Sequence, residues 1–143
     1  MHIPVVFGAS ILVFLGLVHA HFTLKSTPAG GPMTPVTPAV RAAMVQPGGL
    51  GLAPHIESSL WRAWVGFNLS HSLGVVAIGL GIALPAAIDL EQAASNPGWV
   101  VLAVAAPMTY LVLSMRYWFK NPTIGITVGG LAIYGGLIGH ALV

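Results

Sequence analysis

Four long stretches of this sequence contain almost no charged side chain. They run over about 3–22, 60–84, 99–119 and 123–143, and Arg62 and Arg116 are the only Lys, Arg, Asp or Glu residues within them. A helix rises about 1.5 Å per residue, so about 20 apolar residues cross a hydrocarbon core about 30 Å thick. The stretches therefore predict an all-α integral membrane protein, a four-helix bundle in a single transmembrane domain over residues 1–143.

The composition agrees with this class and excludes others. Hydrophobic residues make up 56% of the chain and charged residues only 6%, whereas about 25% of the residues in a soluble domain are charged. Cysteine is absent, which excludes disulfides, thiolate metal sites and thiol nucleophiles. The five Lys and Arg residues are spread along the chain, so a nucleic-acid partner is not expected.

Local signals indicate where the helices begin and end. Asn96 and Asn121 each precede a proline, an arrangement typical of a helix start with a capping side chain. Pro85 and the acidic pair after it are expected to end the second helix near residue 84. Pro107 lies inside the third stretch and predicts a kink, which membranes tolerate when neighbouring helices satisfy the freed backbone groups.

One long connection, 23–59, joins the first two helices, and its first half is rich in Pro and Gly. Thr37 followed by Pro38 is typical of a helix start, and Pro47 with the glycines after it is typical of a helix stop. These signals predict a short helix over about 38–46. This segment either lies on the membrane surface or folds over the bundle as a lid.

The charge distribution predicts an orientation. Asp89 and Glu91 lie in the turn between the second and third helices, and all five basic residues fall at or near the opposite side: Lys25, Arg41, Arg62, Arg116 and Lys120. Basic residues favour the cytoplasmic side of a membrane. We therefore expect a multi-pass protein of the cell inner (cytoplasmic) membrane, with the long loop cytoplasmic and both termini external.

Polar side chains interrupt the second stretch. Trp64, Phe67, Asn68 and His71 recur at helical spacing and predict one face, with His71 about 15 Å below the start of the span. An amide and an imidazole at that depth are costly unless they face partners inside the bundle. In one interpretation this face lines a pocket in which Trp64 and Phe67 contact an apolar ligand, while Asn68, His71 and Ser72 hold its polar group.

A second interpretation makes the same segment a packing surface between helices. Asn68, His71 and the serines Ser70 and Ser72 would then form hydrogen bonds to other helices, and the glycines at 66 and 74 would permit close approach. The sequence leaves both interpretations open.

The pattern W-x-G-F-N-x-S-H-S-x-G begins at Trp64, and His19 lies near the end of the preceding helix. With these features the chain resembles a group of small uncharacterised bacterial four-helix membrane proteins. The resemblance covers mainly the first half of the chain. It implies a fold and a topology, and it implies no activity.

No metal or haem cofactor is expected. The weak candidates for a metal are four residues near the cytoplasmic side: His19, His21, His55 and Glu57. Two His with a third nitrogen or a carboxylate would suit zinc, but residues two apart on a helix point about 200° apart. A haem held by two His needs them at matching depth on facing helices, and His71 has no evident counterpart at its depth.

Three functions remain open. The first is binding of an apolar ligand, a lipid, quinone or isoprenoid, with or without a role as an accessory subunit of a membrane complex. The second is a small membrane enzyme acting on a lipid or isoprenoid, with His71 as acid or base and Asn68 orienting the substrate. The third is a transporter or proton path. Membrane lipids are expected partners, and the Gly-rich face of the last helix offers a docking face for a second copy or a larger complex.

Overall fold

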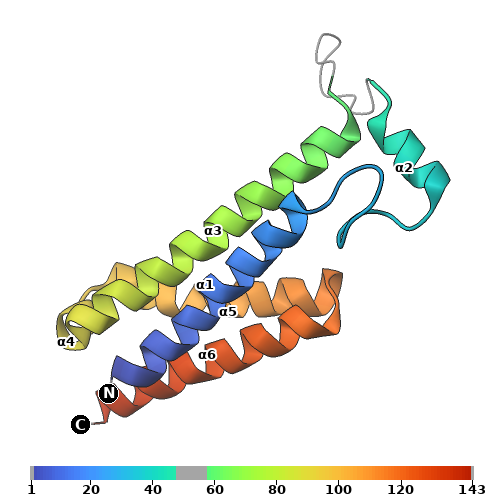
Figure 1. The fold of residues 1–143 in the computed structure, drawn as a ribbon. Helices are drawn as coiled ribbons and strands as arrows, with labels where there is room; N and C mark the ends of the chain where they lie inside the picture. Colours follow the sequence, from blue (N-terminus) through green and yellow to red (C-terminus); the bar gives the residue numbers. More distant parts are fainter. Residues whose placement is uncertain (1, 48–57, 143) are drawn as a thin grey trace. The chain divides into compact units, whose positions relative to one another are not determined.

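A computed structural model describes residues 2–47 and 58–142 of the chain. The helices in order are α1 (His2–Leu24), α2 (Pro38–Val45), α3 (Leu60–Ile88), α4 (Leu90–Ala94), α5 (Pro97–Tyr117) and α6 (Lys120–Ala141) (Figure 1). The described residues form helices and no strand, which confirms the all-α class. Within them, α1, α3, α5 and α6 are the four helices long and apolar enough to cross a membrane.

The second long helix continues beyond its expected end. We expected it to stop near residue 84, but α3 passes through Pro85 and ends at Ile88. Proline has no backbone N–H, so the carbonyl of Gly81, four residues earlier, loses its usual helical donor. The indole Nε1 of Trp99 donates to this carbonyl at 3.2 Å. A side chain from α5 therefore replaces the missing bond and lets the helix continue.

The starts of the last two long helices differ in how well they match the sequence signals. α5 begins at Pro97, and the side chain of Asn96 accepts hydrogen bonds from the N–H groups of Gly98 and Trp99 at 2.9 and 3.2 Å. The capping role expected for Asn96 is confirmed. α6 instead begins at Lys120, and Asn121 lies inside its first turn, so the prediction that Asn121 caps this helix is wrong.

The described chain divides into two compact units, 1–16 with 74–143 and 17–73. In the first unit, the core contains residues of all four long helices. Val5, Ala9 and Leu12 of α1 are 0% exposed, as are Ile82 of α3, Ala103 of α5 and Ile133 of α6. The division into two units does not test whether residues 1–143 form a single transmembrane domain, so that domain stays a prediction.

Glycines allow α1 and α6 to pack with their backbones close together in the first unit. A Cβ atom added at Gly8 would clash with the carbonyl oxygen of Gly129, and one added at Gly136 would lie 2.6 Å from Cγ2 of Val5. The start of α1 and the end of α6 accordingly lie side by side (Figure 1). The Gly-rich face expected to dock a partner is thus largely covered by α1, although no described atom lies within 4 Å of a Cβ placed at Gly135.

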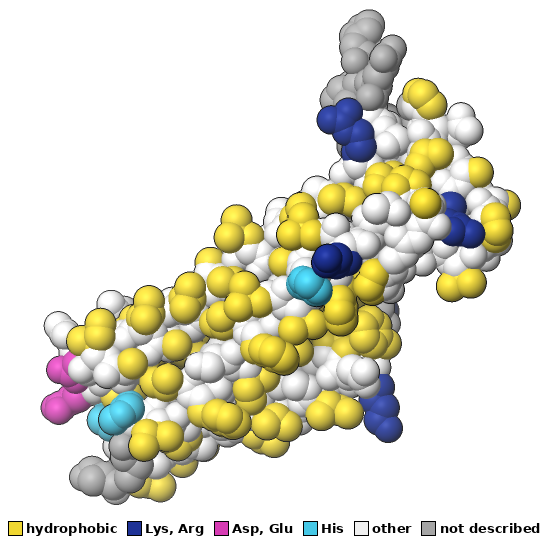
Figure 2. Space-filling model, in the orientation of Figure 1, with side chains coloured by type: hydrophobic (Ala, Val, Ile, Leu, Met, Phe, Trp, Pro, Cys, Tyr) yellow, Lys and Arg dark blue, Asp and Glu magenta, His cyan; other side chains and the backbone are white. Residues whose placement is uncertain are grey.

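The surface of the first unit has apolar flanks and charged ends. Large apolar side chains on different helices are exposed, among them Phe7, Val101 and Leu131, and hydrophobic atoms cover much of the visible surface (Figure 2). Asp89 and Glu91 precede the start of α5, while Arg116 lies near its end. Exposed apolar area on this scale is atypical of a soluble monomer, and it agrees with the four apolar helices of a membrane protein.

Candidate functional site

Two histidines and an asparagine meet in the unit that comprises residues 17–73. The Nε2 atom of His19 on α1 lies 2.9 Å from Oδ1 of Asn68 on α3. The rings of His19 and His71 meet edge to face, with centroids 5.4 Å apart and planes inclined by 76°. All three side chains are half-buried. We call this group the His19–Asn68–His71 cluster.

The hydrogen bonds of Asn68 define the proton position on His19. The Nδ2 atom of Asn68 donates to the carbonyl oxygen of Trp64 at 2.7 Å, so Oδ1 is the amide atom that faces His19. An amide oxygen only accepts hydrogen bonds, and His19 Nε2 must therefore carry a proton and donate. In the neutral imidazole, the Nδ1 atom of His19 is then an acceptor.

The sequence predicts polar partners for Asn68 and His71, but it does not identify His19 as one of them. Depth counted along separate helices had placed His19 near the surface and His71 near mid-membrane. His19 lies five residues before the end of α1, whereas Asn68 and His71 lie more than two turns after the start of α3. Depths counted from each helix end therefore do not match. The signal available in the sequence was the position of His19 near the end of one apolar stretch and of Asn68 near the start of the next.

The serines of this segment bond within their own helix. Ser72 is buried and its Oγ donates to the carbonyl of Asn68 at 2.8 Å, while Ser70 is exposed and donates to the carbonyl of Phe67 at 2.9 Å. The expectation that they bond across to other helices is wrong, because Ser hydroxyls readily return to the carbonyl three or four residues earlier. No described atom lies within 4 Å of a Cβ placed at Gly66, so close approach there is also absent.

The face of α3 that points inward differs from the expected one. Phe67 is 73% exposed, while Ser72 is only 2% exposed. Residues advance about 100° around a helix, so Ser72 lies about 40° from Asn68 and Phe67 about 140° from Ser72. Phe67 does not form a protein-covered wall with Asn68, and we correct that expectation. Trp64 is half-buried and stacks on Trp61, with ring centroids 5.4 Å apart.

A compact turn after α1 fixes the end of the helix that carries His19. The Oγ1 atom of the buried Thr23 donates to the carbonyl of His19 at 2.9 Å. Ser26 is also buried; its Oγ donates to the carbonyl of Phe22 at 2.8 Å and accepts from the N–H of Met33 at 2.9 Å. The bond to Phe22 satisfies one of the carbonyls that a helix end leaves open, and the bond from Met33 attaches the loop to the end of α1.

Of the other candidate metal ligands, only His21 is described, and it does not join the cluster. α1 continues past His21 to Leu24, so the helix does not end between His19 and His21, and His21 is exposed. His55 and Glu57 lie outside the described residues. In the part of the chain that the structure describes, no three His, Cys, Asp or Glu residues are placed to hold a metal ion. The cluster itself offers two imidazoles and an amide, and zinc sites are usually built from four ligands.

Comparisons with known proteins do not assign this chain to a family. No protein-family model matches it, and neither a curated protein nor a solved structure does. The resemblance to small bacterial four-helix membrane proteins therefore stays a prediction, and the functional argument depends on the geometry of the cluster.

Proposed function

We propose that this chain is a multi-pass protein of the cytoplasmic membrane that binds an apolar molecule through its polar group. The ligand is a lipid, a quinone or an isoprenoid, and its polar group lies beside His71. The observation that carries this proposal is the His19–Asn68–His71 cluster, which places two imidazoles and an amide half-buried on two apolar helices. Polar groups at membrane depth are costly, and their presence favours a functional role.

The hydrogen bonds of the cluster favour a ligand that carries oxygen. Asn68 holds His19 by its amide oxygen and is itself held by the carbonyl of Trp64, so the two side chains are oriented before a ligand arrives. Imidazole nitrogens can donate to a carbonyl oxygen or accept from a hydroxyl. In an apolar environment such bonds are stronger than in water, which suits the head of a quinone or an isoprenoid alcohol.

The packing interpretation explains one bond of the cluster, and His71 distinguishes the two interpretations. Asn68 and His19 join α1 to α3, which is what interhelical packing requires. His71 contributes a ring contact with His19, and its side chain is partly exposed. We propose that His19 and Asn68 orient the site and that His71 contacts the ligand.

The enzyme alternative is supported by the ring contact of His71 with His19, but among the described residues a carboxylate beside His71 is missing. The edge of the His19 ring could orient His71 as an acid or base. The chain's acidic residues are Glu57, Asp89 and Glu91, so neither α1 nor the first half of α3 supplies a carboxylate to orient it. Binding therefore has better support than catalysis. A proton path would require further ionisable groups along the spans.

The proposed orientation follows the charges. Within the first unit, the acidic pair precedes α5 and Arg116 lies near its other end. Basic residues favour the cytoplasmic side of a membrane. The end of α5 near Arg116 and the long loop therefore lie inside in this proposal, and both termini lie outside.

The proposal is tested by measuring what the protein retains in mild detergent. The full chain and His71→Ala would be purified in parallel, and bound apolar molecules extracted and quantified by mass spectrometry. We expect His71→Ala to retain about three- to tenfold less ligand, because the lost hydrogen bond is made in an apolar site. Its melting temperature should change little, since His71 is only half-buried.

Ser70→Ala is the matched control, because Ser70 lies next to His71 and bonds only the backbone of its own helix in the described structure. It should retain ligand as the unaltered chain does. A lower melting temperature for His71→Ala with retained ligand unchanged in amount and identity would contradict the proposal. His71 would then act in packing between helices, through an interhelical bond worth about 0.6 to 2 kcal/mol.

A further inference from the structure

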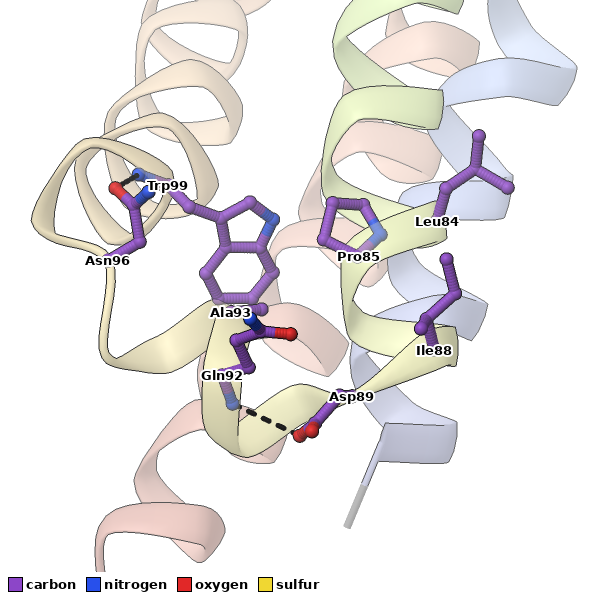
Figure 3. Close-up of a pocket in the computed structure, with 8 residues that line it drawn as sticks. All are labelled: Leu84, Pro85, Ile88, Asp89, Gln92, Ala93, Asn96 and Trp99. Carbon is purple, nitrogen blue, oxygen red and sulfur yellow. Dashed lines mark hydrogen bonds between the residues drawn. The ribbon is translucent and has the colours of Figure 1, made fainter.

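A cavity lies where α3 turns through α4 into α5, within the first unit. Its volume is about 420 Å³, which falls within the range of roughly 300 to 1,000 Å³ for ligand pockets. Figure 3 shows that its lining combines the apolar side chains Leu84, Pro85 and Ile88 with the polar side chains of Asp89 and Gln92. A site with an apolar wall and a polar edge suits a molecule that has both kinds of surface.

The apolar wall is exposed on one side and fixed on the other. Leu84 is 57% exposed and Ile88 is 84% exposed, so both present apolar surface to whatever surrounds α3. On the other side lies the buried ring of Trp99, beside Pro85 (Figure 3). Its Nε1 donates to the carbonyl of Gly81 at 3.2 Å, and this bond holds the indole in place. The side of the cavity that Trp99 forms is thus in place before any ligand arrives.

The polar edge carries a negative charge. Asp89 accepts one hydrogen bond at Oδ1, from the N–H of Gln92 at 3.0 Å. A carboxylate can accept about four hydrogen bonds, so acceptor positions remain. The lining contains this one acid and no Lys or Arg. Arg116 lies near the opposite end of α5. The charge of the cavity therefore complements a cation.

The position along the helices adds a further constraint. Leu84 and Ile88 form the last turn of α3, and Trp99 lies in the first turn of α5. If these helices span the membrane as proposed above, the cavity lies where the hydrocarbon meets the headgroups. Zwitterionic phospholipids carry an ammonium group in the headgroup layer, joined through phosphate and glycerol to apolar acyl chains.

We infer that this cavity binds an amine-bearing phospholipid of the phosphatidylethanolamine class. The ammonium group donates hydrogen bonds to Asp89, and the side chain of Gln92 can donate to the neighbouring phosphate. An acyl chain lies along Leu84 and Ile88. The inference rests on the membrane placement proposed above and is independent of the His19–Asn68–His71 cluster.

Asp89→Asn is the informative substitution because it removes the charge and keeps the helix cap. Asp89 is the N-cap of α4, and Asn caps a helix about as well as Asp does. Glu91→Gln is the matched control: it removes the same charge two residues away, from a side chain outside the lining. Both variants should therefore fold, and only one should affect the cavity.

The experiment uses the full chain reconstituted in nanodiscs of equal parts phosphatidylethanolamine and phosphatidylglycerol. After transfer to mild detergent, native mass spectrometry gives the ratio of the two lipids that remain bound. We expect the unaltered chain and Glu91→Gln to be enriched in phosphatidylethanolamine. In Asp89→Asn the enrichment should be about threefold lower, as for an exposed ion pair. In nanodiscs where phosphatidylcholine replaces phosphatidylethanolamine, it should be retained less well, because its headgroup has no N–H donor.

Three results would overturn the inference. Equal losses in Asp89→Asn and Glu91→Gln would show a general effect of surface charge, and no loss in either would show that Asp89 does not contact lipid. Displacement of the lipid by free ethanolamine would show a site for small amines. His71→Ala should leave the ratio unchanged, so failure here and failure of the ligand proposed at His71 can be told apart.

Discussion

Single glycines determine how closely two helices approach in the first unit. Gly8 on α1 faces the backbone of α6, and an added Cβ would clash with the carbonyl oxygen of Gly129. Backbone cannot move aside as the end of a flexible side chain can. We expect Gly8→Ala to lower stability by about 1 to 3 kcal/mol, the usual cost of overpacking, measured as a lower melting temperature in detergent.

Gly135→Ala is the control for this substitution, because no described atom lies within 4 Å of a Cβ at that position on α6. Alanine favours a helix over glycine by up to about 1 kcal/mol, so the melting temperature of this variant should stay the same or rise. Equal destabilisation by both substitutions would contradict the close packing of α1 against α6.

At the scale of helices, side chains of other helices donate hydrogen bonds to backbone carbonyls beside the prolines inside two spans. The donor from Trp99 to the Gly81 carbonyl compensates Pro85. Pro107 deprives the carbonyl of Ala103 of its helical donor, and the hydroxyl of Tyr134 on α6 donates to the adjacent carbonyl, that of Val104, at 2.9 Å. We expect Tyr134→Phe to lower stability by about 0.6 to 1.7 kcal/mol, the measured range for interhelical bonds in membranes.

Thermal unfolding in detergent measures this loss, and Tyr117→Phe provides the comparison because Tyr117 is 70% exposed at the end of α5. That variant should unfold as the unaltered chain does. If Tyr134→Phe unfolds at the same temperature as the unaltered chain, the bond from Tyr134 to α5 contributes nothing to stability.

The helices could be predicted from the sequence because apolar length is a local property. One wrong prediction has its cause in another helix: the end of α3 depends on Trp99 of α5. The candidate site shows the same division. Asn68 was correctly expected to find a polar partner, while the identity of that partner, His19, depends on how α1 packs against α3. Phe67 was expected on the inward face of α3. Helical spacing groups residues on one face, but it does not show which part of that face other helices cover.

For the whole molecule, the central claim is that the chain crosses the membrane with its basic loop in the cytoplasm, and both proposed sites depend on the crossings. The chain has no cysteine, so single cysteines report position without interference. Gly31 in the loop would be a poor position: its φ is +144°, and a Cβ there would lie 2.5 Å from Cα of Ser26. Ala42, Ser95 and Asn121 are exposed in the structure and suit the purpose.

The most direct measurement is labelling of these single cysteines with an impermeant thiol reagent in intact cells, with permeabilised cells as the control. We expect Ser95→Cys to react from outside, because it follows the acidic turn, while Ala42→Cys and Asn121→Cys react only after permeabilisation. Labelling of Ala42→Cys from outside, with Ser95→Cys protected, would contradict the orientation. Labelling of all three in intact cells would contradict the membrane crossings themselves.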